Sequence, residues 1–277
     1  MKNCIQLGVG NQTALISGRI LFEKDFPIKI QTSNGPRATV TLRYGKNQDM
    51  LDAFFTTLAA YIIDTYERKL LKQRLQTQYD NLKPFQLQEI VGFLPELEED
   101  QTLCAAVRTQ LVKDGLFTYF KEHEQASLEG LVTFRLRLYD ALLNKVADRL
   151  LELYFMHKEY EEFIDLLRYF VRVQDGRPQL VHLIVHPCSM YAILNEDQED
   201  ITAECVAEFA TPDEVCSDTF DDLLISILIT LAPEKIMVHN SGSIENDTLF
   251  ATIQKVFDAV EYCTGCSLCG TVKTQCK

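Results

Sequence analysis

The residues whose type and spacing best suit chemistry are four cysteines near the end of the sequence. Two residues separate Cys263 from Cys266 and Cys266 from Cys269, and six residues separate Cys269 from Cys276. Thiolates at such short intervals bind one metal ion from a tight turn, and Gly265 lets the backbone fold around it. We therefore predict that a metal site, if the chain has one, consists of these four cysteines.

The occupant of this site stays open at the level of sequence. Four cysteines would complete a tetrahedral zinc site, whereas three with a ligand from elsewhere could hold an iron–sulfur cluster. The spacing differs from the ferredoxin run and from the longer loop of a ribbon-type zinc site. A redox-active Cys-x-x-Cys pair and a tail of unbound thiols are the other interpretations.

A second group of candidate ligands is His182, His186 and Cys188. Their even spacing would place them on one face of a continuous strand, as a ligand set or a Cys–His pair. Pro187, however, begins a turn, and no carboxylate at a fixed spacing orients either imidazole. We therefore expect structural roles for these residues.

Signatures of common enzymes are missing from the sequence. Gly8-Val9-Gly10 lacks the third glycine of a dinucleotide-binding turn, and no phosphate-binding Gly-Lys-Ser/Thr occurs. Neither Gly-x-Ser-x-Gly nor His-Glu-x-x-His is present. We assign no catalytic or organic-cofactor residue and favour a non-catalytic interaction protein, with an enzyme site built from scattered residues as a further alternative.

Composition limits the partners and the compartment. The 277 residues carry a formal net charge of −13, which does not favour nucleic acid or anionic membranes as partners. No apolar run reaches the roughly 20 residues of a membrane span, and we expect no signal peptide, because polar residues and glycines interrupt the first residues after Met1. We expect a cytoplasmic protein with reduced cysteines and protein partners. We expect the acidic stretch over 196–222 to form a solvated face that docks a basic partner or the basic residues 1–46. The loop 195–200 could instead bind a divalent cation, although it lacks the glycine and the spacing of an EF-hand.

The sequence divides into three parts, 1–46, 47–173 and 174–277. In the first part, β-rich segments at 18–30 and 38–44 flank the turn signal Asn34-Gly35. In the second, Asn47 caps a long helix, and prolines bracket a short helix at 85–94. Thr102 is expected to cap a helix that ends near Gly115.

The strongest helical pattern runs from Leu128 to about Val173, with Ser127 as its cap. Four-residue spacing predicts a buried stripe through Phe134, Leu138, Leu142 and Val146, and a later one through Phe163, Leu167 and Val171. Because 45 residues is long for one helix, we expect a break near 154–159.

The third part alternates strands and helices. Strands are predicted at 180–185, 190–194, 201–209, 235–239 and 260–263, and helices at 218–231 and, after the cap Asn246, at 248–258. The predicted class is α+β, with a small N-terminal sheet, a helical middle and a C-terminal mixed sheet with flanking helices.

Several stretches of the chain resemble the YtxC family. They are Leu131-Val132-Thr133-Phe134-Arg135-Leu136, the run from Lys158 to Val171, Val181-His182-Leu183 and Leu231-Ala232-Pro233-Glu234-Lys235-Ile236. The resemblance covers about residues 100–263. It implies a sporulation-linked, cytosolic role in an endospore-forming Firmicute, and it implies no reaction and no catalytic residues. The terminal cysteines are not part of it.

Overall fold

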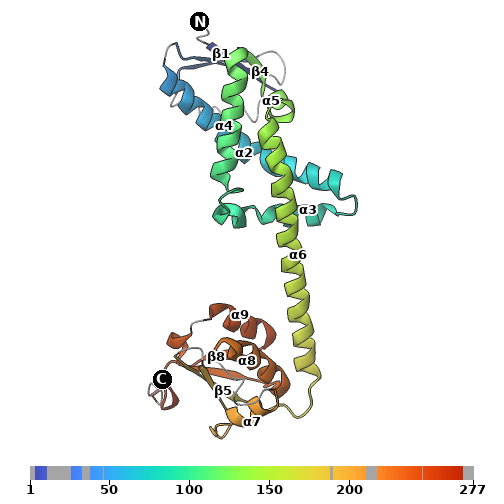
Figure 1. The fold of residues 1–277 in the computed structure, drawn as a ribbon, viewed down its shortest axis with the longest axis vertical. Helices are drawn as coiled ribbons and strands as arrows, with labels where there is room; N and C mark the ends of the chain where they lie inside the picture. The colour runs from blue at the N-terminus through green and yellow to red at the C-terminus, as the bar shows by residue number, and fades with distance from the viewer. Residues whose placement is uncertain are drawn as a thin grey trace. The chain divides into compact units, whose positions relative to one another are not determined.

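The computed structural model describes residues 4–10, 26–32, 38–45, 47–187, 190–209, 217–244 and 246–270. It confirms the α+β class, with one small N-terminal sheet and one small C-terminal sheet, each flanked by helices (Figure 1). The chain forms two compact units, Met1–Met156 and His157–Lys277. Of the helices in the described part, none combines the length and apolar character that crossing a bilayer requires.

The N-terminal unit holds a four-stranded sheet in the order β2-β3-β1-β4. Its strands are β1 Cys4–Val9, β2 Ile28–Thr32, β3 Ala38–Arg43 and β4 Gln125–Ser127. Strand β3 lies antiparallel to β1 and β2, and β4 lies parallel to β1. Strands β1 and β4 were not predicted, because Gly8 interrupts one and the other is a three-residue polar segment. The predicted Asn34-Gly35 turn and residues 18–25 lie outside the described residues.

Helices α2, α3 and α4 follow, at Gln48–Gln78, Pro84–Gly92 and Ala105–Glu122, with a 3-10 helix η1 at Leu94–Glu99. Asn47 caps α2 as predicted, since its Oδ1 accepts the Met50 N–H at 3.0 Å. The cap predicted at Thr102 was wrong. The Asp100 carboxylate accepts the Thr102 N–H at 2.7 Å and keeps that segment in a turn, so α4 begins at Ala105.

Helix α4 also continues through Gly115, where we predicted its end. A Cβ at this position would lie 2.7 Å from Leu136 Cδ2. The missing side chain at Gly115 therefore lets α4 pack closely against Leu136. This packing offsets the free-energy cost of about 1 kcal/mol that a glycine carries inside a helix.

Helices α5 Leu128–Phe134 and α6 Arg137–Val173 form the long helical region. Ser127 caps α5 by accepting the Gly130 N–H at 3.4 Å. The predicted break at 154–159 was wrong, because α6 contains neither Gly nor Pro and continues through it (Figure 1). The chain instead breaks at Arg135–Leu136, and α6 contributes residues to both units.

The predicted stripe on this region is partly wrong. Phe134 and Leu138 are 73% and 70% exposed, and Phe163 is 49% exposed. Val146 is buried as predicted, and the face of α6 that packs in the N-terminal unit also includes Tyr139, Leu143, Ala147, Leu150 and Tyr154. Further along, Leu167 and Val171 pack into the second core as predicted, together with Ile164.

The C-terminal unit holds a sheet in the order β6-β5-β7-β8. Its strands are β5 Val181–His186, β6 Met190–Leu194, β7 Ile236–His239 and β8 Val260–Tyr262, and its further helices are α7 Thr202–Ala207, α8 Ser217–Leu231 and α9 Asp247–Val256. Strand β6 is antiparallel to β5, whereas β5, β7 and β8 run parallel. Asn246 caps α9 as predicted, accepting the Leu249 N–H at 3.0 Å.

The strand predicted at 201–209 was wrong, since α7 occupies most of that segment. Asp200 accepts the Thr202 N–H at 2.9 Å, and the Thr202 hydroxyl accepts the Ile193 N–H at 2.8 Å. These bonds turn the chain away from β6, so residues after Thr202 cannot add to the sheet.

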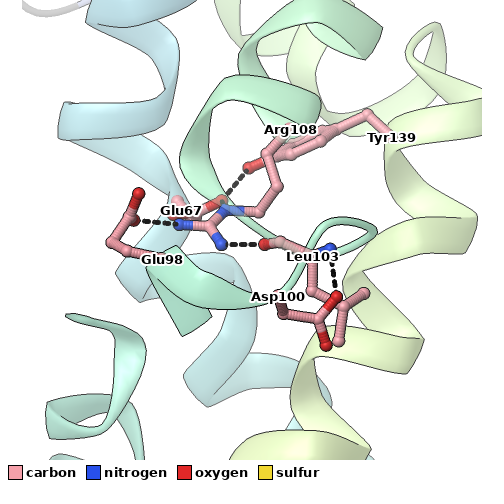
Figure 2. Close-up of polar contacts among 6 residues, drawn as sticks. All are labelled: Glu67, Glu98, Asp100, Leu103, Arg108 and Tyr139. Atoms are coloured by element: carbon pink, nitrogen blue, oxygen red, sulfur yellow. Dashed lines mark hydrogen bonds and ion pairs between the residues drawn. The ribbon is translucent and has the colours of Figure 1, made fainter. Parts of the chain in front are cut away.

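A buried ion pair and a hydrogen bond to it link three helices of the N-terminal unit (Figure 2). Arg108 Nε of α4 lies 2.9 Å from Glu67 Oε1 of α2, and the Tyr139 hydroxyl of α6 donates to the same oxygen at 3.2 Å. The Arg108 guanidinium also donates to the Leu103 carbonyl. Burial raises the pKa of Glu67, while the positive charge of Arg108 opposes that rise.

We expect Arg108→Leu to lower the free energy of unfolding by about 3–5 kcal/mol, because it leaves the Glu67 carboxylate buried without its counter-ion. Combining it with Glu67→Gln should restore part of the loss, since the remaining buried group is then neutral. Urea unfolding followed by circular dichroism measures both effects. The control is Arg149→Leu, which breaks an exposed pair with Glu152 and should cost less than about 1 kcal/mol.

Candidate metal centre

The site begins where two adjacent parallel strands end. His239 is the last residue of β7, and Cys263 directly follows β8. Val238 pairs with Tyr262, and the Cys263 N–H donates to the Val238 carbonyl at 2.8 Å. Because the two strands run in the same direction, their carboxyl ends bring His239 and Cys263 to the same edge of the sheet.

A tight turn after β8 returns the other two cysteines to this edge. The backbone of Gly265 has a φ of +131°, a conformation that residues other than glycine rarely adopt. Its N–H points to Cys263 Sγ at 3.4 Å. The 3-10 helix η3, Leu268–Gly270, then follows, and the Cys269 N–H donates to the Cys266 carbonyl at 3.2 Å.

Four potential ligand atoms converge here. The Nδ1 of His239 and the Sγ atoms of Cys263, Cys266 and Cys269 all lie within 4.8 Å of one another. Cys269 Sγ is 3.8 Å from Cys266 Sγ and 3.7 Å from Cys263 Sγ. His239 Nδ1 is 3.3 Å from Cys266 Sγ and 3.7 Å from Cys269 Sγ.

These distances match the edges of a coordination tetrahedron. Zinc–sulfur bonds of about 2.3 Å at tetrahedral angles place neighbouring sulfurs about 3.8 Å apart, and a zinc–nitrogen bond of about 2.0–2.1 Å shortens the nitrogen–sulfur edges slightly. The donor set of three thiols and one imidazole is also one that structural zinc sites use. The residues present therefore fit a single zinc ion.

The structure thus brings together three of the four predicted cysteines. Cys276 lies outside the described residues, and His239 is the residue that accompanies Cys263, Cys266 and Cys269. Sequence reasoning missed His239. A signal was available, because the predicted strands 235–239 and 260–263 end in His239 and Cys263, but their pairing was not predicted.

His182, from the second predicted group, contacts the ring nitrogen of His239 that does not face the cysteines. Its Nδ1 is 3.0 Å from His239 Nε2, and both residues are buried. Burial lowers the pKa of both imidazoles, and the neighbouring His182 lowers that of His239 further. His186 ends β5 and, among the described residues, does not join the cluster, while Cys188 lies outside the described residues.

The local backbone favours a thiolate at Cys269. The N–H groups of Asn240 and Cys266 hydrogen-bond this sulfur and lower the pKa of the thiol. Asn240 follows His239 directly and adopts the left-handed conformation, with φ of 57°. The last residue of β7 and the residue that follows it therefore supply an imidazole and a backbone donor to the same site.

Comparison with known proteins identifies related sequences. The sequence model of the YtxC-like family matches residues 53–259. A protein of Bacillus subtilis (strain 168) described as "Uncharacterized protein YtxC" is 28% identical over 156 residues, which cover 54% of this chain and 52% of that protein. The matched region thus spans about half the length of this relative. No solved structure matches the chain.

We expect Gly265→Ala to weaken zinc binding about 5- to 30-fold. Its Cβ meets no atom within 4 Å, but the left-handed backbone would be strained by roughly 1–2 kcal/mol. Competition with a chromophoric chelator measures the affinity. Gly176→Ala is the matched control, because Gly176 also has a positive φ, of 70°, and open space, but lies outside the cluster. Equal losses in both variants would contradict a specific role for the turn.

Proposed function

This chain belongs to the YtxC-like family, and we propose that it is a zinc protein in which Cys263, Cys266, Cys269 and His239 hold one Zn²⁺. The observation that carries the proposal is the convergence of four ligand atoms within 4.8 Å, from two strand ends and one turn. Three of these residues belong to the cysteine group singled out by spacing alone.

Zinc suits this site better than an iron–sulfur cluster. In a four-iron cluster each cysteine binds a different iron atom, and in a two-iron cluster the four ligands are divided between two iron atoms, so ligands of different irons stand further apart than ligands of a single ion. Here Cys269 Sγ is 3.7–3.8 Å from both other sulfurs, the spacing that one ion requires. The imidazole, with Nδ1 only 3.3 Å from Cys266 Sγ, fits the same single centre.

The proposed role of the ion is structural. Four protein ligands fill a tetrahedral shell and leave no position for a substrate or a reactive water, unlike a catalytic site with three protein ligands. Metal binding would fasten the segment after β8 to the end of β7. A binding protein without a reaction of its own is consistent with this closed shell.

Metal analysis after anaerobic purification tests this proposal. We expect about one zinc per chain, and removal with a chelator should lower the thermal stability of the C-terminal unit. His239→Ala should abolish stoichiometric zinc binding, because it removes the imidazole ligand.

The variant Cys276→Ser decides between the two candidate fourth ligands. It should retain zinc with wild-type affinity if His239 completes the shell. Loss of zinc in Cys276→Ser with retention in His239→Ala would instead support a four-cysteine site. A wild-type protein free of zinc and iron, with unchanged stability after chelation, would contradict both assignments.

A second candidate function is a sporulation-linked interaction with a protein partner. Its support is the resemblance to sporulation proteins together with an exposed apolar surface on α6. Large apolar side chains that are about half exposed recur along this helix, at Phe163, Leu166, Tyr169, Phe170 and Val173. Such a continuous stripe is typical of a protein interface rather than of a solvated helix face. The same proposal places the protein in the cytoplasm, where thiols stay reduced, without nucleic acid as a partner.

We expect deletion of the gene in its spore-forming host to reduce the yield of heat-resistant spores. Complementation with a Leu166→Glu/Phe170→Glu variant should fail, because the charges disrupt an apolar contact while leaving the buried face of α6 intact. Asp165→Asn, on the polar face of the same helix, should restore the yield. Normal sporulation of the deletion strain would exclude this role.

A further inference from the structure

The strand register places two histidines side by side on one face of the C-terminal sheet. In the parallel pair β5 and β7, His182 lies opposite Met237, and Ile184 lies opposite His239. His182 is therefore a diagonal neighbour of His239. The opposite face of β5 carries Val181, Leu183 and Val185, which belong to the apolar core of this unit.

The contact between the two imidazoles requires one donor and one acceptor. His182 Nδ1 and His239 Nε2 are 3.0 Å apart, a normal hydrogen-bond length. The two side chains are only 9% and 3% exposed, so water does not readily replace either partner. A neutral imidazole carries one proton, which sits on one of its two nitrogens.

The direction of this hydrogen bond follows from what the other ring nitrogen of His239, Nδ1, must do. Its Nδ1 faces the sulfurs of Cys266 and Cys269 at 3.3 and 3.7 Å and must offer a lone pair to bind a metal ion. The His239 proton then lies on Nε2 and is donated to His182 Nδ1. His182 in turn carries its own proton on Nε2.

We propose that His182 is a positioning residue of the metal centre, which holds His239 in the tautomer and ring orientation that presents Nδ1 to the ion. This inference rests on the proposed zinc function and extends the site by one residue that is not a ligand. Metal-binding histidines generally donate their second N–H to such a partner, and loss of the partner typically weakens metal binding about 10- to 100-fold.

The partner here is a neutral imidazole rather than a carboxylate. Three thiolates, one neutral imidazole and Zn²⁺ already leave a net charge of −1 at the centre. A carboxylate behind His239 would add a second negative charge in a buried position, which is costly. An uncharged acceptor orients the ring without that cost.

Two substitutions of His182 separate its acceptor role from its volume. His182→Leu fills the space but cannot accept a hydrogen bond, and we expect a 10- to 100-fold loss of zinc affinity by chelator competition. His182→Asn places an amide oxygen near the position of Nδ1, so its affinity should stay within about threefold of wild type. Val185→Ala, on the opposite face of β5, is the control for a general loss of stability and should leave the affinity unchanged.

Long-range ¹H–¹⁵N NMR of His239 provides a readout that a merely structural role would not change. In the metal-free protein, we expect the Nε2–H tautomer in the wild type and in His182→Asn, and a mixture of tautomers in His182→Leu. Because this measurement needs no metal, it remains informative if the wild type binds no zinc, an outcome that would defeat only the proposed function.

Two results with the variants would overturn the inference about His182. One is a His182→Leu variant with wild-type zinc affinity and an unchanged His239 tautomer. The other is an equal loss of affinity in His182→Asn, His182→Leu and Val185→Ala, which would indicate general destabilisation of the sheet. A wild-type His239 that carries its proton on Nδ1 in the metal-free protein would also contradict it, even if His182→Leu does not fold.

Discussion

The parallel pairing of β7 with β8 is the constraint on which the candidate metal centre depends. Ile236, Met237 and Val238 pair with Val260, Glu261 and Tyr262, and the ladder continues to Cys263. This register sets the distance between an imidazole and a thiol that are far apart in the sequence. A register shifted by one residue would turn one of the two side chains to the other face of the sheet.

The polar clusters of the two units find their partners in different ways. In the N-terminal unit, Glu67 and Arg108 neutralise each other and Tyr139 supplies a further hydrogen bond, so both charges have a partner within the protein. In the C-terminal unit, the ligand atoms of His239 and three cysteines face one another and share no ion pair. A cation is the partner that would satisfy them, whereas the ion pair needs none.

Local sequence signals predicted much of the fold because they are physical properties of a few residues. Asn47, Ser127 and Asn246 cap helices through their own side chains, and short apolar runs marked most of the C-terminal strands. Errors arose where tertiary contacts decide. Gly115 remains helical because it packs against Leu136, and residues 202–207 are helical rather than extended because Thr202 binds β6.

The candidate site shows the same division between local and long-range information. Cys263, Cys266 and Cys269 were identifiable because their spacing is local. His239 was not, since its role depends on which strands are neighbours, and the strand order β6-β5-β7-β8 cannot be read from periodicity. His182 was noticed for its spacing to His186, although its structural partner is His239, 57 positions away.

The identity of the fourth ligand changes what the metal would do for the protein. With Cys276, all ligands would lie in one short terminal segment, and the ion would order that segment alone. With His239, the ion joins residues 30 positions apart, from the end of β7 to Cys269, and closes a loop that contains α9 and β8. Closing such a loop removes conformational freedom from the unfolded chain, as a disulfide does in the chain-entropy account. Metal binding would then stabilise half of the C-terminal sheet, and through His182 its effect would extend to β5.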